Sequence, residues 1–293
     1  MAFSPSRSKT RHHARSISLP SRSHPLILQL NEHLCRLRSS EATCLTLSLV
    51  SSRLSGLEDL YDSIEDLLMS SHSQQAFGQE RSEKWVDEVL DGYLIGLLDA
   101  CATTKDVLAH MKQNAQQLVS ILRRRRGEND DLSWYLASRK QAKKVIQKSL
   151  KGLKSIRNKN TPLGLDKDIE TVAIVSMLNE VEEVTLAVLE SILSYIAGTK
   201  QPSWSLISKL RHPKGRESKQ EETLINEFDK VEAALNSCGG HKTIKSDANM
   251  NAENLHNHLV KLESSVEDLG EGLECLFRRL IKTRVSLLNI LSH

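Results

Sequence analysis

Two long stretches without proline constrain the fold of this chain more than any other feature. No proline occurs between Leu26 and Thr161, or between Lys214 and the end of the 293-residue sequence. Proline removes a backbone donor and breaks the interior of a helix. Long stretches that lack it and are rich in Leu, Glu, Lys and Ser are typical of helices. We therefore expect an α-helical protein.

Apolar residues recur at helical spacing along these stretches. The clearest stripe alternates steps of four and three residues over 255–280, and its pattern continues to the chain end. A second stripe of this kind covers 47–68, and others cover 86–122, 132–153 and 169–196. Steps of three and four place apolar side chains on one side of a helix and are also typical of coiled coils. These segments predict long amphipathic helices.

The segments between the stripes define the expected connections. Gly, Pro, Asn and Ser gather at 70–78, 127–131, 158–164, 198–203, 212–218 and 238–249. No segment alternates apolar and polar residues between turn signals, so we expect essentially no sheet. Short connections place consecutive helices antiparallel. The sequence thus predicts an all-α, up-and-down bundle of about six helices, several of them long, with residues 25–293 forming a single domain.

Residues 1–24 differ in composition from the rest of the chain. They hold seven serines and five basic residues, and the first acidic residue is Glu32. Such a segment has too little apolar side chain to offset the entropy cost of ordering it. We expect a disordered, basic N-terminal tail.

The tail carries the most specific motif of the chain. Arg15 lies three residues before Ser18, Ser16 lies between them, and Pro20 follows Ser18 by two residues. This spacing resembles ligands of 14-3-3 proteins, in which an arginine cluster holds the phosphorylated serine. The motif predicts a phosphorylation site that binds a protein partner. Two alternatives stay open: a plastid or mitochondrial transit peptide, because the tail is rich in Arg and Ser and free of acids, and an inert solvated tail.

A second candidate site is a basic stretch at 139–159, with nine positive charges and no acid. Its core members are Arg139, Lys140, Lys143, Lys144, Lys148, Lys151 and Lys154. The face is either solvated, paired with the acidic residues of 58–66 and 263–274, or bound to an anionic membrane. Nucleic acid is disfavoured because no aromatic platform accompanies the charge. The neighbouring Arg123–Arg126 cluster ends a predicted helix, and its alternative role is nuclear localisation.

Motifs of catalysis are missing from the sequence. It contains no glycine-rich phosphate loop, no GxSxG and no HExxH. Only Glu253 and His256 have the Glu-x-x-His spacing of a di-iron bundle, which needs two such pairs. The five cysteines form no CxxC pair, which fits a reducing compartment. We expect no catalytic residue, no metal and no cofactor, and no apolar run approaches the ~20 residues of a membrane span.

Seven segments together resemble a known family. They are His13–Pro25, Glu32–Arg38, Lys84–Gly92, Arg123–Gly127, Tyr135–Lys140, Trp204–Leu210 and Leu269–His293. The pattern is similar to that of a plant-specific, BYPASS-like family of unknown function, with a variable loop at 238–251. The resemblance implies an α-helical protein linked by name to root and shoot development, and it supplies no catalytic residues.

Taken together, the sequence predicts a non-enzymatic interaction or regulatory protein of plant development that is controlled by phosphorylation of its tail. The alternative is a peripheral membrane adaptor that binds anionic lipid through the basic stretch. The expected compartment is the cytoplasm, with the nucleus or an organelle as alternatives.

Overall fold

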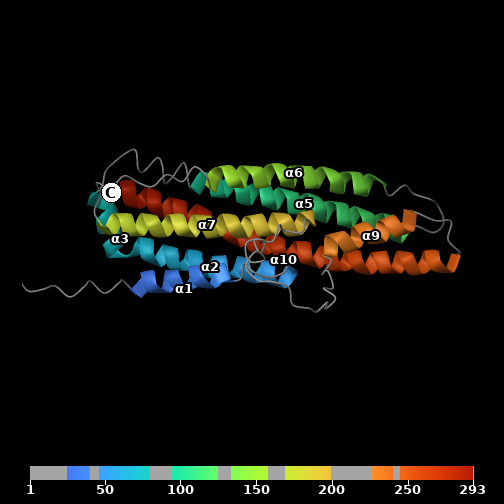
Figure 1. The fold of residues 1–293 in the computed structure, drawn as a ribbon, viewed down its shortest axis with the longest axis horizontal. Helices are drawn as coiled ribbons and strands as arrows, with labels where there is room; N and C mark the ends of the chain where they lie inside the picture. The colour runs from blue at the N-terminus through green and yellow to red at the C-terminus, as the bar shows by residue number, and fades with distance from the viewer. Residues whose placement is uncertain are drawn as a thin grey trace, which may run out of the picture.

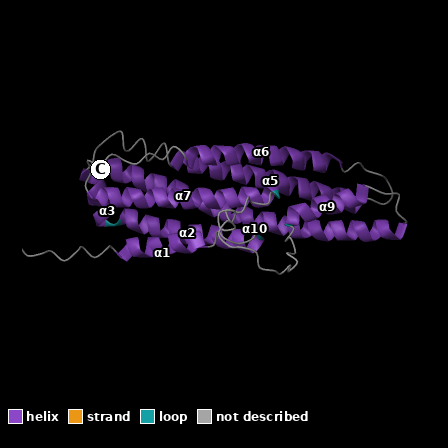
Figure 2. Cartoon of the chain, in the orientation of Figure 1, coloured by secondary structure: helices purple, strands orange, loops and turns teal. Residues whose placement is uncertain are grey.

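The computed structural model describes residues 25–39, 46–79, 94–124, 133–157, 169–198, 226–239 and 245–292. These residues form eight α-helices and no strand (Figures 1 and 2). The helices are α1 (Pro25–Ser39), α2 (Leu47–Met69), α3 (Ser71–Gln79), α5 (Ile95–Arg124), α6 (Ser133–Arg157), α7 (Ile169–Ala197), α9 (Glu227–Gly239) and α10 (Lys245–Ser292). The all-α prediction is confirmed, although about six helices were expected.

The long helices lie side by side along one axis, and α2, α5, α6 and α7 alternate in direction (Figure 1). The contacts of α5 with α10 show the same antiparallel arrangement. Lys112 Nζ lies 2.5 Å from Glu267 Oε2, and Gln116 Nε2 donates to Glu263 Oε1 at 2.9 Å. A step of four residues forward on α5 thus matches a step of four residues back on α10. The up-and-down bundle is confirmed.

Helix α10 is the central element of the core. It packs against α2, α3, α5 and α9. Its predicted apolar stripe is fully buried at Leu255, Leu259, Leu262, Val266, Leu269, Leu273, Leu276 and Leu280. Burial of each leucine contributes about 1.5–3 kcal/mol relative to leaving it in water. The predicted stripe on α2 is also buried from Val50 to Leu68.

The expected break at 70–78 is wrong, because helix α3 lies there. Ser70 joins the two helices: its Oγ donates to the Leu67 carbonyl and accepts from the Ser73 backbone N–H. One residue therefore caps the end of α2 and the start of α3. Phe77 anchors α3 because its side chain is buried in the core.

The expected loop at 238–251 is shorter than predicted. Helix α9 continues to Gly239, and α10 begins at Lys245. No glycine or proline occurs at 245–254, so the helix extends about three turns ahead of its first buried leucine, Leu255. By contrast, the predicted end of α7 is confirmed at Gly198, whose φ of 69° is accessible to glycine without strain.

Candidate functional site

Helix α6 has two chemically different faces. Its inner face buries Tyr135, Ala142, Ile146 and Leu153, and the helix packs on α5 and α7. Its outer face carries the exposed lysines Lys140, Lys144, Lys148, Lys151 and Lys154, which we call the lysine face. Steps of three and four residues along each set produce this division. Basic residues of the predicted patch therefore gather on one side of α6.

The lysine face carries uncompensated charge. Among the described residues, none of its five members forms an ion pair, and α6 itself contains no acidic residue. Positive charges that face solvent without partners attract anions over about a Debye length, ~8–10 Å at physiological salt. This part of α6 is suited to contact an anionic surface.

Arg139 does not belong to the exposed patch, contrary to the sequence-based interpretation. Its side chain is 1% exposed, and its guanidinium carbon lies 4.8 Å from the centre of the Phe228 ring of α9. Burial lowers the pKa of Arg139, whereas Tyr135, Glu232 and Asp229 act in the opposite direction. A sequence signal for this existed: Arg139 follows Tyr135 by four residues and precedes Ala142 by three, which places it on the buried stripe.

Glu232 of α9 pairs with two basic residues of α6. Its Oε2 lies 2.8 Å from Lys143 Nζ and 3.7 Å from Arg139 Nε. Burial raises the pKa of the neighbouring carboxyl of Asp229, whereas the positive charges of Arg139 and Lys143 lower it. Lys143 is thereby neutralised within the molecule, unlike the lysine face.

Helix α9 itself was missed by the sequence analysis. Asn226 caps it by accepting the Asp229 backbone N–H at 2.8 Å, and donates to the Tyr195 carbonyl of α7 at 2.6 Å. The spacing of Phe228, Val231 and Leu235, all buried, is the apolar signal that was available. The helix is short, so this signal is weak.

The expected pairing of the basic stretch with the acidic segments of α2 and α10 is not observed among the described residues. Arg157 of α6 instead pairs with Glu190 of α7 at 3.2 Å. The acids of α2 pair with α10, as Asp62 does with Arg279 at 2.8 Å. The acids of α10 pair with lysines of α5, for example Lys112. Antiparallel neighbours decide these pairs, and α6 is not packed against α2 or α10 over any extended region.

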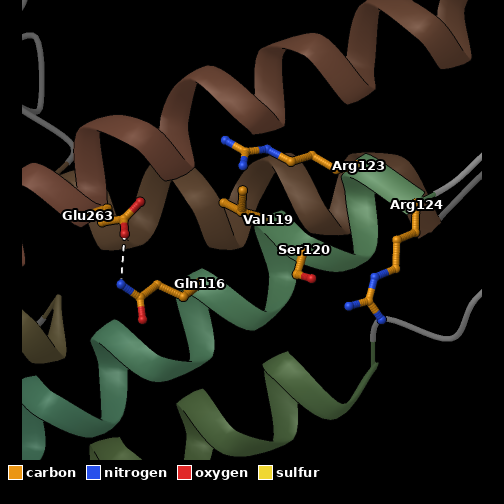
Figure 3. Close-up of a pocket in the computed structure, with 6 residues that line it drawn as sticks. All are labelled: Gln116, Val119, Ser120, Arg123, Arg124 and Glu263. Carbon is orange, nitrogen blue, oxygen red and sulfur yellow. Dashed lines mark hydrogen bonds between the residues drawn. The ribbon is translucent and has the colours of Figure 1, made fainter.

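The arginines at the end of α5 line a shallow pocket beside α10 (Figure 3). Gln116, Val119, Ser120, Arg123, Arg124 and Glu263 surround it. Arg123 and Arg124 are exposed, and Glu263 brings a carboxylate to the same space, so the pocket has mixed charge. Arg125 and Arg126 lie outside the described residues.

Three further points of the sequence analysis concern the tail motif, metal ligands and membrane-spanning helices. The tail motif at Arg15, Ser16, Ser18 and Pro20 lies outside the described residues. Within the described residues, no group of three or more His, Cys, Asp or Glu side chains is arranged to hold a metal ion. No helix in this part of the chain is long and apolar enough to span a membrane.

Comparison with known protein families gives a match over most of the chain. The family model described as Protein BPS1 matches residues 53–290, which include helices α3 to α9 and most of α2 and α10. Searches of curated proteins and of solved structures found no match.

Proposed function

The chain belongs to the Protein BPS1 family, and on this basis we propose that it is a non-enzymatic interaction protein of plant development that docks on anionic membrane surfaces through α6. Family membership suggests the developmental role. We further propose that this role lies in root and shoot development and that the protein acts in the cytoplasm. The cytoplasmic leaflet is rich in anionic lipid, which fits that compartment.

The observation that supports membrane docking is the unpaired lysine face. Lys140, Lys144, Lys148, Lys151 and Lys154 follow one side of α6, opposite the stripe that anchors the helix to α5 and α7. The helix spans 25 residues, so these lysines are presented along a straight, supported edge. Each basic residue held near an anionic surface contributes about 1 kcal/mol. Five together are sufficient for reversible membrane binding.

Vesicle flotation tests this function. We expect the full chain to float with phosphatidylcholine vesicles that contain phosphatidylserine, and to lose binding steeply as salt rises. The variant Lys140→Glu/Lys144→Glu/Lys148→Glu should bind on the order of 100-fold more weakly. A matched control reverses the same number of charges elsewhere, at Arg36, Lys261 and Arg278, which are exposed on α1 and α10. Equal losses in both variants would show that only net charge matters and would contradict docking through α6.

A second proposal concerns control through the tail. Arg15, Ser18 and Pro20 have the spacing of a phosphorylated 14-3-3 ligand, and we propose that phosphate on Ser18 selects such a protein partner. The test is capture of 14-3-3 protein by the full chain after phosphorylation, compared with Ser18→Ala. If both chains capture it equally, the serine does not control the interaction.

A further inference from the structure

The buried guanidinium of Arg139 is unsatisfied. Among the residues that the structure describes, its Nε, Nη1 and Nη2 atoms have no hydrogen-bond partner, and its side chain is 1% exposed. Phe228 contacts the guanidinium through its ring, but a ring face does not replace the planar acceptors that an arginine fork prefers. A buried cation without hydrogen bonds is costly, so this side chain has unused capacity to donate to an acceptor.

The carboxylate of Glu232 is the ion-pair partner of both Arg139 and Lys143. Glu232 lies 2.8 Å from Lys143 but 3.7 Å from Arg139 Nε, beyond hydrogen-bond distance. Asp229, on the same helix, adds a second negative charge nearby. The side chains of Lys143 and Glu232 are 32% and 31% exposed. The entrance to the site is therefore at the surface, next to the lysine face.

We propose that Arg139 and Lys143 form a phosphate-binding site that Glu232 occupies in the unbound molecule, and that a phosphate monoester on a lipid headgroup displaces this carboxylate. The proposal deepens the proposed membrane docking and rests on it for the source of the ligand. Rotation of the Glu232 side chain toward solvent is sufficient to open the site. Helix α9 stays in place, because Phe228, Val231 and Leu235 remain buried.

A phosphate monoester suits the site better than the carboxylate does. It offers three terminal oxygens and up to two negative charges, so it can accept hydrogen bonds from the Arg139 fork and from Lys143 together. Glu232 offers a single oxygen to both cations and, among the described residues, leaves the guanidinium nitrogens of Arg139 without a hydrogen bond. The exposed lysine face then extends the contact to the surrounding anionic lipid.

The experiment compares two phosphatidylcholine vesicles of equal surface charge, one containing phosphatidylinositol 4,5-bisphosphate and the other phosphatidylserine. Only the first carries phosphate monoesters. Glu232→Gln removes the competing charge with little change of shape, and it should tighten binding to the bisphosphate vesicles about fivefold for each basic side chain released. Lys143→Gln should weaken that binding by about fivefold. Glu267→Gln, which removes an equal charge that faces Lys112 of α5, is the matched control.

The outcomes separate this site from membrane docking in general. If Glu232→Gln and Glu267→Gln change the affinity for both kinds of vesicle equally, the proposed phosphate site is wrong. Membrane docking through α6 still stands in that case, provided that the triple lysine-face variant loses binding. If the lysine-face variant binds normally, the proposed docking function is wrong. Soluble inositol 1,4,5-trisphosphate identifies the source of the phosphate. A Glu232→Gln effect seen with this molecule and not with vesicles would overturn the assignment to a lipid headgroup.

Discussion

Replacing Arg139 by methionine should leave the free energy of unfolding nearly unchanged or raise it, although this side chain is 1% exposed. Within the described part of the chain the guanidinium makes no hydrogen bond, and its ion pair with Glu232 is long, at 3.7 Å. A buried charge repays its desolvation only when its geometry and hydrogen bonding are good. Methionine fills much of the same space and can contact the Phe228 ring through sulfur. Glu232 would keep Lys143 as its partner at 2.8 Å, and the carboxyl of Asp229 would lose the charge of Arg139 but keep that of Lys143.

The magnitude follows from two opposing effects. Loss of the cation–π contact costs about 0.5–2 kcal/mol. Removal of a poorly hydrogen-bonded buried charge gains about 1–4 kcal/mol where its partner keeps another cation, as the 31% exposed Glu232 keeps Lys143. The two ranges combine to a net change between a loss of about 1 and a gain of about 3.5 kcal/mol, measured by urea unfolding with circular dichroism. Arg139→Ala is the comparison, since the cavity it leaves should make it about 2–5 kcal/mol less stable than the methionine variant. A loss of more than about 1 kcal/mol in Arg139→Met, with an unchanged denaturant slope, would refute the reasoning.

Three further predictions concern the bundle itself. Gly198→Ala should lower the free energy of unfolding by about 1–3 kcal/mol in urea titrations, because φ is 69° and the new Cβ would clash with the Asp229 carboxylate; an unchanged value would mean that the end of α7 adjusts freely. Leu269→Ala should cost about 2–5 kcal/mol in the same assay, because Leu269 is fully buried on α10, and a loss near zero would place it outside the core. Burial raises the pKa of Cys101 from 9.0 to about 12. As the pH rises, the thiol therefore ionises in the unfolded chain before it does in the folded one. The contribution of Cys101 to the free energy of unfolding is complete below pH 9 and is lost as the pH rises toward 12. Cys101→Val should flatten the dependence of this free energy on pH between 9 and 12, and an unchanged dependence would contradict the raised pKa of Cys101.

The periodic apolar pattern was a reliable guide to the long helices. The stripes over 47–68 and 255–280 became the buried faces of α2 and α10, because residues at steps of three and four share one side of a helix and are buried together. In the short helices α3 and α9, the caps Ser70 and Asn226 each accept a hydrogen bond from the backbone N–H group three residues ahead. Each helix is anchored by the burial of one aromatic side chain, Phe77 or Phe228, which only the tertiary structure provides.

The candidate site on α6 was likewise predictable from the sequence only in part. The composition of 139–159 is enough to predict a strongly basic helix, and its periodicity is enough to place Lys140, Lys144, Lys148 and Lys151 on one side. Which basic residues are neutralised depended on the tertiary structure. Glu232 is 89 positions from Lys143 in the sequence, and it meets α6 because α9, which packs on α10, brings its side chain to Lys143. Coulomb interactions act over a few ångströms of space rather than along the chain, so only the folded bundle distinguishes the buried Arg139 from the free lysines beside it.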